Sequence, residues 1–174
     1  MSVDQFSLFF ALLAVVAQLG AVGLAGAGLV PRARAAVRNV IGPSALWLAA
    51  GVAAVCMGGS LYFSERAGFP PCALCWYQRI CMYPLVAVVG LAAARRDFAA
   101  RLYAAPLVLI GFGIATYHVL LERFPSLETG VCEVANPCSI VWVERLGYVT
   151  IPVMSLSGFA LIGTLLAYAS PEAP

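Results

Sequence analysis

Five long apolar segments, separated by short polar breaks, constrain the fold of this chain more than any other feature. The segments cover residues 6–30, 45–63, 75–94, 102–121 and 149–169. A helix of about 20 apolar residues crosses the hydrocarbon layer of a bilayer, which is about 30 Å thick. Only 10% of the 174 residues are charged, whereas charged residues make up about 25% of a soluble domain. The sequence therefore predicts an all-α membrane protein with five spans, forming a single membrane domain over residues 1–174.

The arginines predict the orientation of the spans, because short loops rich in basic residues stay in the cytoplasm. The first and third breaks each hold three arginines, with Asp97 as the one acid between them, whereas the second and fourth breaks together hold five acids and three arginines. We therefore expect the N-terminus to lie outside and the C-terminus in the cytoplasm. No basic residue precedes the first apolar run, so we interpret that run as a retained helix rather than a cleaved signal.

Four of the six cysteines lie in the two outward breaks, where the compartment permits disulfides. Cys72 and Cys75 form a C-x-x-C motif directly after Pro70-Pro71, where an extended segment enters a membrane helix. Free amides at the start of a helix stabilise a thiolate, and such thiols exchange rapidly. The same spacing also occurs in metal sites and in passive disulfides that tie a loop.

Cys132 and Cys138 close a small loop that contains an Asn-Pro turn signal. A disulfide here would add little chain-entropy stabilisation, because it encloses so few residues. We expect an exposed bond that is well suited to exchange. Two dithiols on one side of a membrane can pass a disulfide by thiolate attack. The remaining cysteines, Cys56 and Cys81, lie in apolar runs and resemble buried hydrophobic residues without a redox role.

Arg79 follows Cys75 by four residues, which places both on one face of the third span. A charge within a membrane segment is costly and suggests a function. The guanidinium either extends to the interface or stabilises the Cys75 thiolate or a reduced, anionic electron acceptor. Gln78 and Tyr83 lie nearby, and we interpret them as interfacial or packing residues.

His118 is the one histidine of the chain and lies near the outer end of the fourth span. Two interpretations stay open: a local pair with Glu122 one turn later, or a hydrogen-bond donor or proton relay to the electron acceptor. Three aromatic side chains near the outer ends of spans are expected in an interfacial aromatic belt, namely Trp76, Tyr77 and Trp142.

Two stretches of sequence resemble a known family. The run from Pro71 to Pro84 (PCALCWYQRICMYP), and the Cys132 to Cys138 segment followed by Gly147 to Leu156 (GYVTIPVMSL), are similar to the bacterial disulfide bond formation protein B family, especially its BdbC branch. The resemblance spans residues 45–169 and implies a four-helix catalytic core in the inner membrane, with its active-site loops outside the cytoplasm. Residues 6–30 then form an extra N-terminal transmembrane helix, a departure from the family.

The resemblance also implies an activity. Such a protein oxidises a DsbA-like thioredoxin-fold partner and passes two electrons to a membrane quinone, either ubiquinone or menaquinone. Cys132 would form the mixed disulfide with the partner, Cys138 would exchange with Cys72, and Cys75 would lie beside the quinone.

The resemblance assigns the quinone site two further residues. Arg79 matches the quinone-site arginine of the family, and His118 corresponds more loosely to a histidine near the quinone. The second cysteine pair is closer in sequence than in the enterobacterial branch, so a long flexible relay loop is not implied.

Other classes of function fit the sequence less well. Four thiolates suit a structural zinc site, but the outer compartment favours oxidation of thiols. A reductase that works in the opposite direction has the same residues, because direction depends on the redox potentials of the couples. A non-enzymatic membrane scaffold is a further alternative. The net charge of +2 gives no reason to expect a nucleic-acid partner.

Overall fold

The structure is a computed structural model that describes residues 2–133 and 135–171. Met1, Val134 and residues 172–174, which form most of the expected C-terminal tail, lie outside the described residues. Five helical segments of the described chain are long and apolar enough to cross a membrane. This finding confirms the prediction of an all-α membrane protein.

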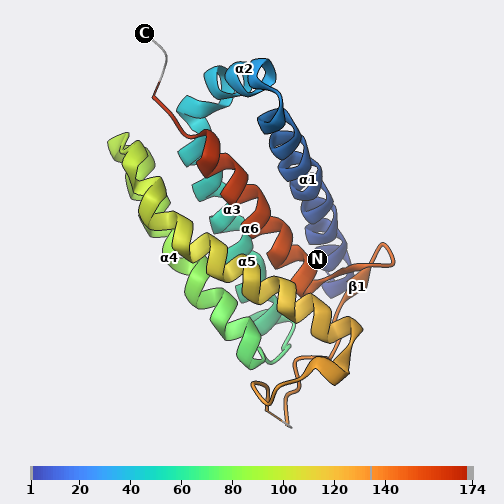
Figure 1. Ribbon diagram of the computed structural model, residues 1–174. Helices are drawn as coiled ribbons and strands as arrows, with labels where there is room; N and C mark the ends of the chain where they lie inside the picture. The colour runs from blue at the N-terminus through green and yellow to red at the C-terminus, as the bar shows by residue number, and fades with distance from the viewer. Residues whose placement is uncertain (1, 134, 172–174) are drawn as a thin grey trace.

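The α-helices of the described chain follow one another with short connections (Figure 1). They are α1 (Val3–Leu29), α2 (Pro31–Ile41), α3 (Ala45–Leu61), α4 (Ala73–Arg95), α5 (Arg101–Arg123) and α6 (Ile151–Tyr168). Single 3-10 turns lie at η1 (Gly42–Ser44), η3 (Phe98–Ala100) and η4 (Pro125–Leu127), and a π-helical turn, η2 (Tyr62–Arg66), extends α3. Two short antiparallel strands, β1 (Glu144–Arg145) and β2 (Val149–Thr150), precede α6.

Helices α3 to α6 form a bundle in which each helix packs against its two neighbours, and α1 packs along the outside of α6. Large apolar side chains such as Leu46, Leu85 and Phe159 are fully buried between the four helices. Gly111 permits the close approach of α5 to α6, because a Cβ at this position would lie 2.3 Å from the Phe159 ring. The four-helix bundle with an added N-terminal helix agrees with the predicted architecture.

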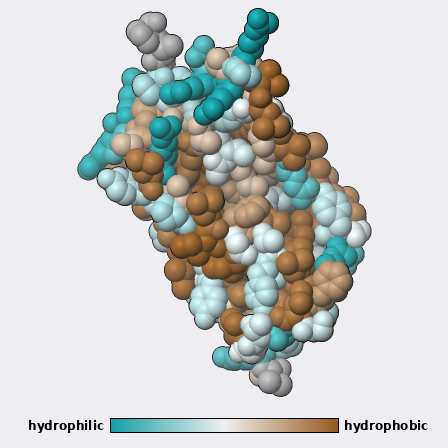
Figure 2. All heavy atoms as spheres, in the orientation of Figure 1, coloured by the Kyte–Doolittle hydropathy of each residue, from teal (hydrophilic) through white to brown (hydrophobic). Residues whose placement is uncertain are grey.

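The two ends of the bundle differ in charge. The break at residues 31–44, expected as a polar connection, contains the surface helix α2, which buries no residue and exposes Arg32, Arg34 and Arg38. Figure 2 shows hydrophilic side chains gathered at this end, with a hydrophobic band below them. The loops that carry both cysteine pairs lie at the opposite end (Figure 1). The N-terminus is at the loop end too, because Asp4 forms an ion pair with Arg145.

Candidate functional site

The Cys72/Cys75 pair is positioned by the first turn of α4. Cys72 is the N-cap residue in extended backbone conformation, and its sulfur accepts a hydrogen bond from the Cys75 amide at 3.4 Å. The two sulfurs are 2.9 Å apart and belong to free thiols. As the sequence predicted, the motif lies where an extended Pro-Pro segment enters a membrane helix.

The electrostatic surroundings of Cys72 favour its thiolate. The hydrogen bond from the Cys75 thiol, assisted by His118 and by the Cys75 amide, lowers the pKa of Cys72 from 9.0 to about 4 against the opposing effect of burial. Because a hydrogen bond to the charged form stabilises that form, Cys72 carries the negative charge of the reduced pair.

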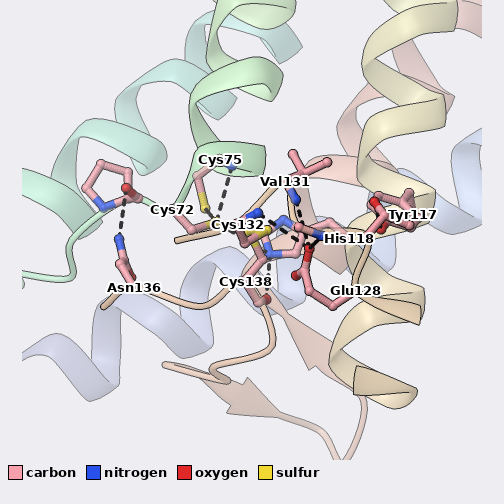
Figure 3. The surroundings of a disulfide bond; sticks show 12 residues. Cys72, Cys75, Tyr117, His118, Glu128, Val131, Cys132, Asn136 and Cys138 are labelled. Carbon is pink, nitrogen blue, oxygen red and sulfur yellow. Dashed lines mark hydrogen bonds between the residues drawn. A yellow bond between two sulfur atoms is a disulfide. The ribbon is translucent and has the colours of Figure 1, made fainter. Parts of the chain in front are cut away.

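The second pair forms a disulfide, Cys132–Cys138, in the loop after α5. The carboxylate of Glu128 accepts hydrogen bonds from the amides of Gly130, Val131 and Cys132 at 3.1, 3.2 and 3.4 Å. The side-chain amide of Asn136 donates to the carbonyl oxygen of Pro71 at 3.2 Å, which ties this loop to the segment before α4 (Figure 3).

The expectation of an exposed disulfide is wrong for one of its two cysteines. Cys138 is only 1% exposed, because it packs in one buried cluster with Cys72, Leu74 and Leu121. Cys132 is only partly buried. The two pairs therefore share one cluster, and the loop does not need to be long to connect them.

His118 lies between the two pairs and is 3% exposed (Figure 3). Its Nε2 is 3.1 Å from the carbonyl oxygen of Cys138 and 3.7 Å from the sulfur of Cys72. Because a carbonyl only accepts, Nε2 donates in this contact, and Nδ1 accepts from the Gln78 side-chain amide at 2.9 Å. No hydrogen bond joins His118 to Glu122, whose carboxylate accepts from Thr150 Oγ1 at 2.5 Å and interacts with the imidazole only electrostatically.

Gln78 has a larger role than the packing or interfacial one expected from the sequence. Its side chain is buried and donates to Nδ1 of His118, which fixes the tautomer of the ring. A signal was present, because Gln78 follows Cys75 by three residues and so shares its helix face. A polar side chain in a membrane span suggests a function.

Arg79 is held by α3 rather than by the cysteines. Its Nε donates to Ser60 Oγ at 2.9 Å, its Nη2 donates to the Ser60 carbonyl at 3.1 Å, and its guanidinium lies 5.1 Å from the Trp76 ring centroid. Tyr83 donates to the same Ser60 hydroxyl at 3.2 Å. Within residues 2–133 and 135–171, no carboxylate forms an ion pair with Arg79.

A cavity of about 490 Å³ opens beside these residues. Its polar lining includes Cys75, Gln78, Arg79 and His118, and the rest is mostly apolar side chains from α1, α3 and α6. Ligand sites are commonly apolar cavities of about 300–1,000 Å³ with a few polar groups. The structure thus brings Cys75, Arg79 and His118 to one cavity, although Arg79 makes no hydrogen bond to Cys75.

The structure also shows the positions of three other residues discussed from the sequence, namely Trp142, Cys81 and Cys56. Trp142, expected in an aromatic belt, lines the cavity and stacks on Phe69 with ring centroids 5.3 Å apart. Cys81 is buried in the core of the bundle, and Cys56 lies beside Gly158 at the cavity wall.

Comparison with known proteins identifies the family. A family model described as "Disulfide bond formation protein DsbB" matches residues 43–169. "Disulfide bond formation protein C" of Bacillus subtilis is 43% identical over 113 residues, which cover 64% of this chain and 81% of the relative. "Probable disulfide formation protein C 2" of Bacillus anthracis is 41% identical, covering 62% of this chain and 76% of the relative.

A third relative, "Probable disulfide formation protein" of Chlamydia trachomatis, is 40% identical over 111 residues, covering 64% of this chain and 81% of the relative. No solved structure matches the chain significantly. The match to residues 43–169 includes α3 to α6 and both cysteine pairs but not α1. The chain therefore belongs to the DsbB family of disulfide bond formation proteins.

Proposed function

We propose that this protein is a membrane thiol:quinone oxidoreductase that regenerates the disulfide of a DsbA-like, thioredoxin-fold partner. One observation carries the proposal: the Cys72/Cys75 pair packs against the buried Cys138 on one side and reaches a large cavity, through Cys75, on the other. A dithiol in this position connects a protein-facing disulfide with an acceptor dissolved in lipid. The names of the relatives support disulfide formation as the overall activity.

The relay begins at Cys132, the more accessible sulfur of the outer disulfide. A thiolate of the partner attacks Cys132 and releases Cys138, and the second partner thiolate then resolves the mixed disulfide. The partner leaves as a disulfide, and its two electrons stay on Cys132 and Cys138 as a dithiol. Every step breaks one S–S bond and forms one.

The electrons then move inward. The Cys138 thiolate attacks Cys72 of an oxidised Cys72/Cys75 pair and releases Cys75. Cys132 next attacks Cys138, which restores the outer disulfide and releases Cys72. The low pKa of Cys72 favours this last step, because a thiol of low pKa is a good leaving group. The arrangement in the structure, with the outer pair oxidised and the inner pair free, corresponds to the end of this transfer.

The residues around the cavity fit a quinone head group. Arg79, Gln78 and His118 supply hydrogen-bond donors near Cys75, and the positive charge of Arg79 has no carboxylate partner in the described chain. A bound quinone would accept two electrons as Cys72 and Cys75 close to a disulfide, together with the proton of the Cys75 thiol and one proton from water, because Cys72 is already a thiolate. The protein contributes the position of Cys75, the donors that hold the acceptor, and apolar walls that exclude water.

We also propose that the cysteine loops face the extracytoplasmic side of a bacterial inner membrane. Six arginines lie at the opposite end of the bundle, namely Arg32, Arg34, Arg38, Arg95, Arg96 and Arg101. Such clusters stay in the cytoplasm. The outer compartment would then contain the partner and favour the Cys132–Cys138 disulfide.

The test uses the purified full-length protein in lipid with ubiquinone or menaquinone and a reduced thioredoxin-fold protein. We expect quinone-dependent, multiple-turnover oxidation of the partner by the wild type and none by Cys75→Ser. Cys81→Ser is the matched control, because Cys81 lies on the same helix but is buried in the bundle core. Quinone-dependent turnover that persists in Cys75→Ser would refute the proposal, and net reduction of the partner would favour the reductase.

A zinc site is less well supported than the relay. The outer cysteines share a disulfide and so offer no thiolates, while Cys72, Cys75 and His118 form a separate group of possible ligands. Metal analysis with thiol counting separates the two functions. One zinc with four alkylatable loop thiols would favour the metal site.

A further inference from the structure

Helix α1 lies outside the family match, yet it lines the cavity that reaches Cys75. Phe10, Leu13, Ala14 and Ala17 contribute its α1 side, opposite Leu48 and other residues of α3. In the bundle of α3 to α6 alone, this side of the cavity would be open to lipid. The extra helix therefore changes the shape of the proposed acceptor site.

The polar and apolar parts of the cavity are separated along α3. Ser60, which holds Arg79, lies at the polar end, while Trp47 and Leu48 line the other end. Ser60 follows Leu48 by twelve positions, which corresponds to about 18 Å along a helix. A head group near Arg79 thus leaves a long apolar slot between α1 and α3.

The position of α1 is set by specific contacts at several depths. Near its start, Arg145 pairs with Asp4 and donates to Ser7 Oγ at 2.9 Å. Gln18 donates to Ser157 Oγ at 3.0 Å in the middle of the helix. Near its end, the Tyr168 hydroxyl donates to the Leu24 carbonyl at 2.7 Å.

The contact between α1 and α3 closes the slot near the cysteines. The ring of Phe10 fills the notch left by Gly59, where a Cβ would lie 2.4 Å from the ring. The Phe6 and Tyr62 rings stack nearby. Farther along, α1 and α3 do not pack against each other as neighbouring helices, and the slot separates them.

We propose that α1 is a wall of the quinone site and holds the isoprenoid tail of the quinone between itself and α3. This inference rests on the proposed function, because it assigns the tail of the same acceptor whose head group lies near Cys75. The slot is continuous with the head-group region in one cavity. The chain thereby selects its acceptor by the tail as well as by the head.

The test compares a quinone without a tail with the same quinone carrying a long isoprenoid tail, using the full chain in lipid. Ala17→Phe projects a ring into the slot, and Leu13→Ala removes part of the wall. We expect the KM for the tailed quinone to rise about tenfold in Ala17→Phe and about fivefold in Leu13→Ala, from lost apolar contact. The KM for the tail-less quinone should not change.

Two controls distinguish binding of the tail by α1 from unspecific effects of an added ring and from effects on the head group. Ala25→Phe places the same ring on an exposed part of α1 that does not line the cavity, and we expect it to behave as the wild type. Arg79→Met alters the head-group end and should impair both quinones by the same factor. Leu13→Ala keeps the proposal testable if Ala17→Phe does not fold.

A direct readout does not depend on turnover. A long-tailed quinone with a photoreactive group midway along its tail should label peptides covering residues 10–17, and excess unlabelled tailed quinone should prevent the labelling. Label confined to other helices or to lipid, or an unchanged tail preference in both α1 variants, would overturn the inference while the wild type still reduces quinone. A wild type that reduces neither quinone would instead refute the proposed function.

Discussion

The two cysteine pairs are held in contrasting ways. Cys72 and Cys75 are free thiols fixed by the first turn of α4 and by the buried His118. Cys132 and Cys138 form a disulfide in a loop organised around one exposed carboxylate, Glu128. In the proposed relay, the inner pair would therefore owe its reactivity to electrostatics and the outer pair to access.

Removing one inner cysteine should have the largest effect on activity. Without Cys72, the outer dithiol has no disulfide to attack. We expect Cys72→Ala to lower multiple turnover by about 10³-fold or more, since members of a covalent relay act as a unit. One equivalent of partner should still be oxidised by the outer disulfide. Alkylation and mass spectrometry of the partner measure this stoichiometry, with Cys81→Ala as the control; a second equivalent per chain would contradict the relay.

Changing His118 should weaken the electrostatic stabilisation of the Cys72 thiolate. A lowered pKa keeps Cys72 as the thiolate at neutral pH and loses the charge only as the pH falls towards about 4. In His118→Leu the pKa should rise towards 9.0, since one of its causes is removed. We expect internal exchange at neutral pH to slow about tenfold.

Thiolate absorbance against pH measures this shift. Thr116→Val is the matched control, because Thr116 lies two residues before His118 on α5 and its hydroxyl bonds to the Phe112 carbonyl of the same helix. A titration midpoint that is the same in His118→Leu and in the wild type would show that the imidazole does not stabilise the charge.

The smallest effect is expected at the outer loop. Glu128→Ala removes the acceptor of three loop amides, each worth about 1 kcal/mol or less at an exposed site. Hydrogen exchange at residues 130–132 should become about fivefold faster, whereas partner oxidation should change less than about threefold. Glu133→Ala is the control, as the Glu133 side chain makes no hydrogen bond in the described chain. A large loss of activity would mean that the ordered conformation of the loop, rather than the accessibility of Cys132, limits the rate of partner oxidation.

The sequence predicted what local patterns determine. Apolar runs of span length located the membrane helices, and the Pro-Pro-Cys pattern located the start of α4. Contacts between segments that are far apart in the chain could not be predicted from these local patterns. The burial of Cys138 depends on Leu74 and Leu121, which come from two different helices. The roles of Gln78 and of α1 likewise arise only when α5 and α3 are packed beside them.

The bond between His118 and the loop has a consequence for the proposed relay. The imidazole holds the peptide carbonyl of Cys138, an acceptor that is present whatever the sulfur is bonded to. In the proposed relay, this hydrogen bond would persist in either oxidation state of the loop, and the sulfurs would exchange partners while the backbone stays in place. A Cys138→Ser complex trapped with the proposed partner should therefore keep the contact between His118 and the carbonyl of residue 138.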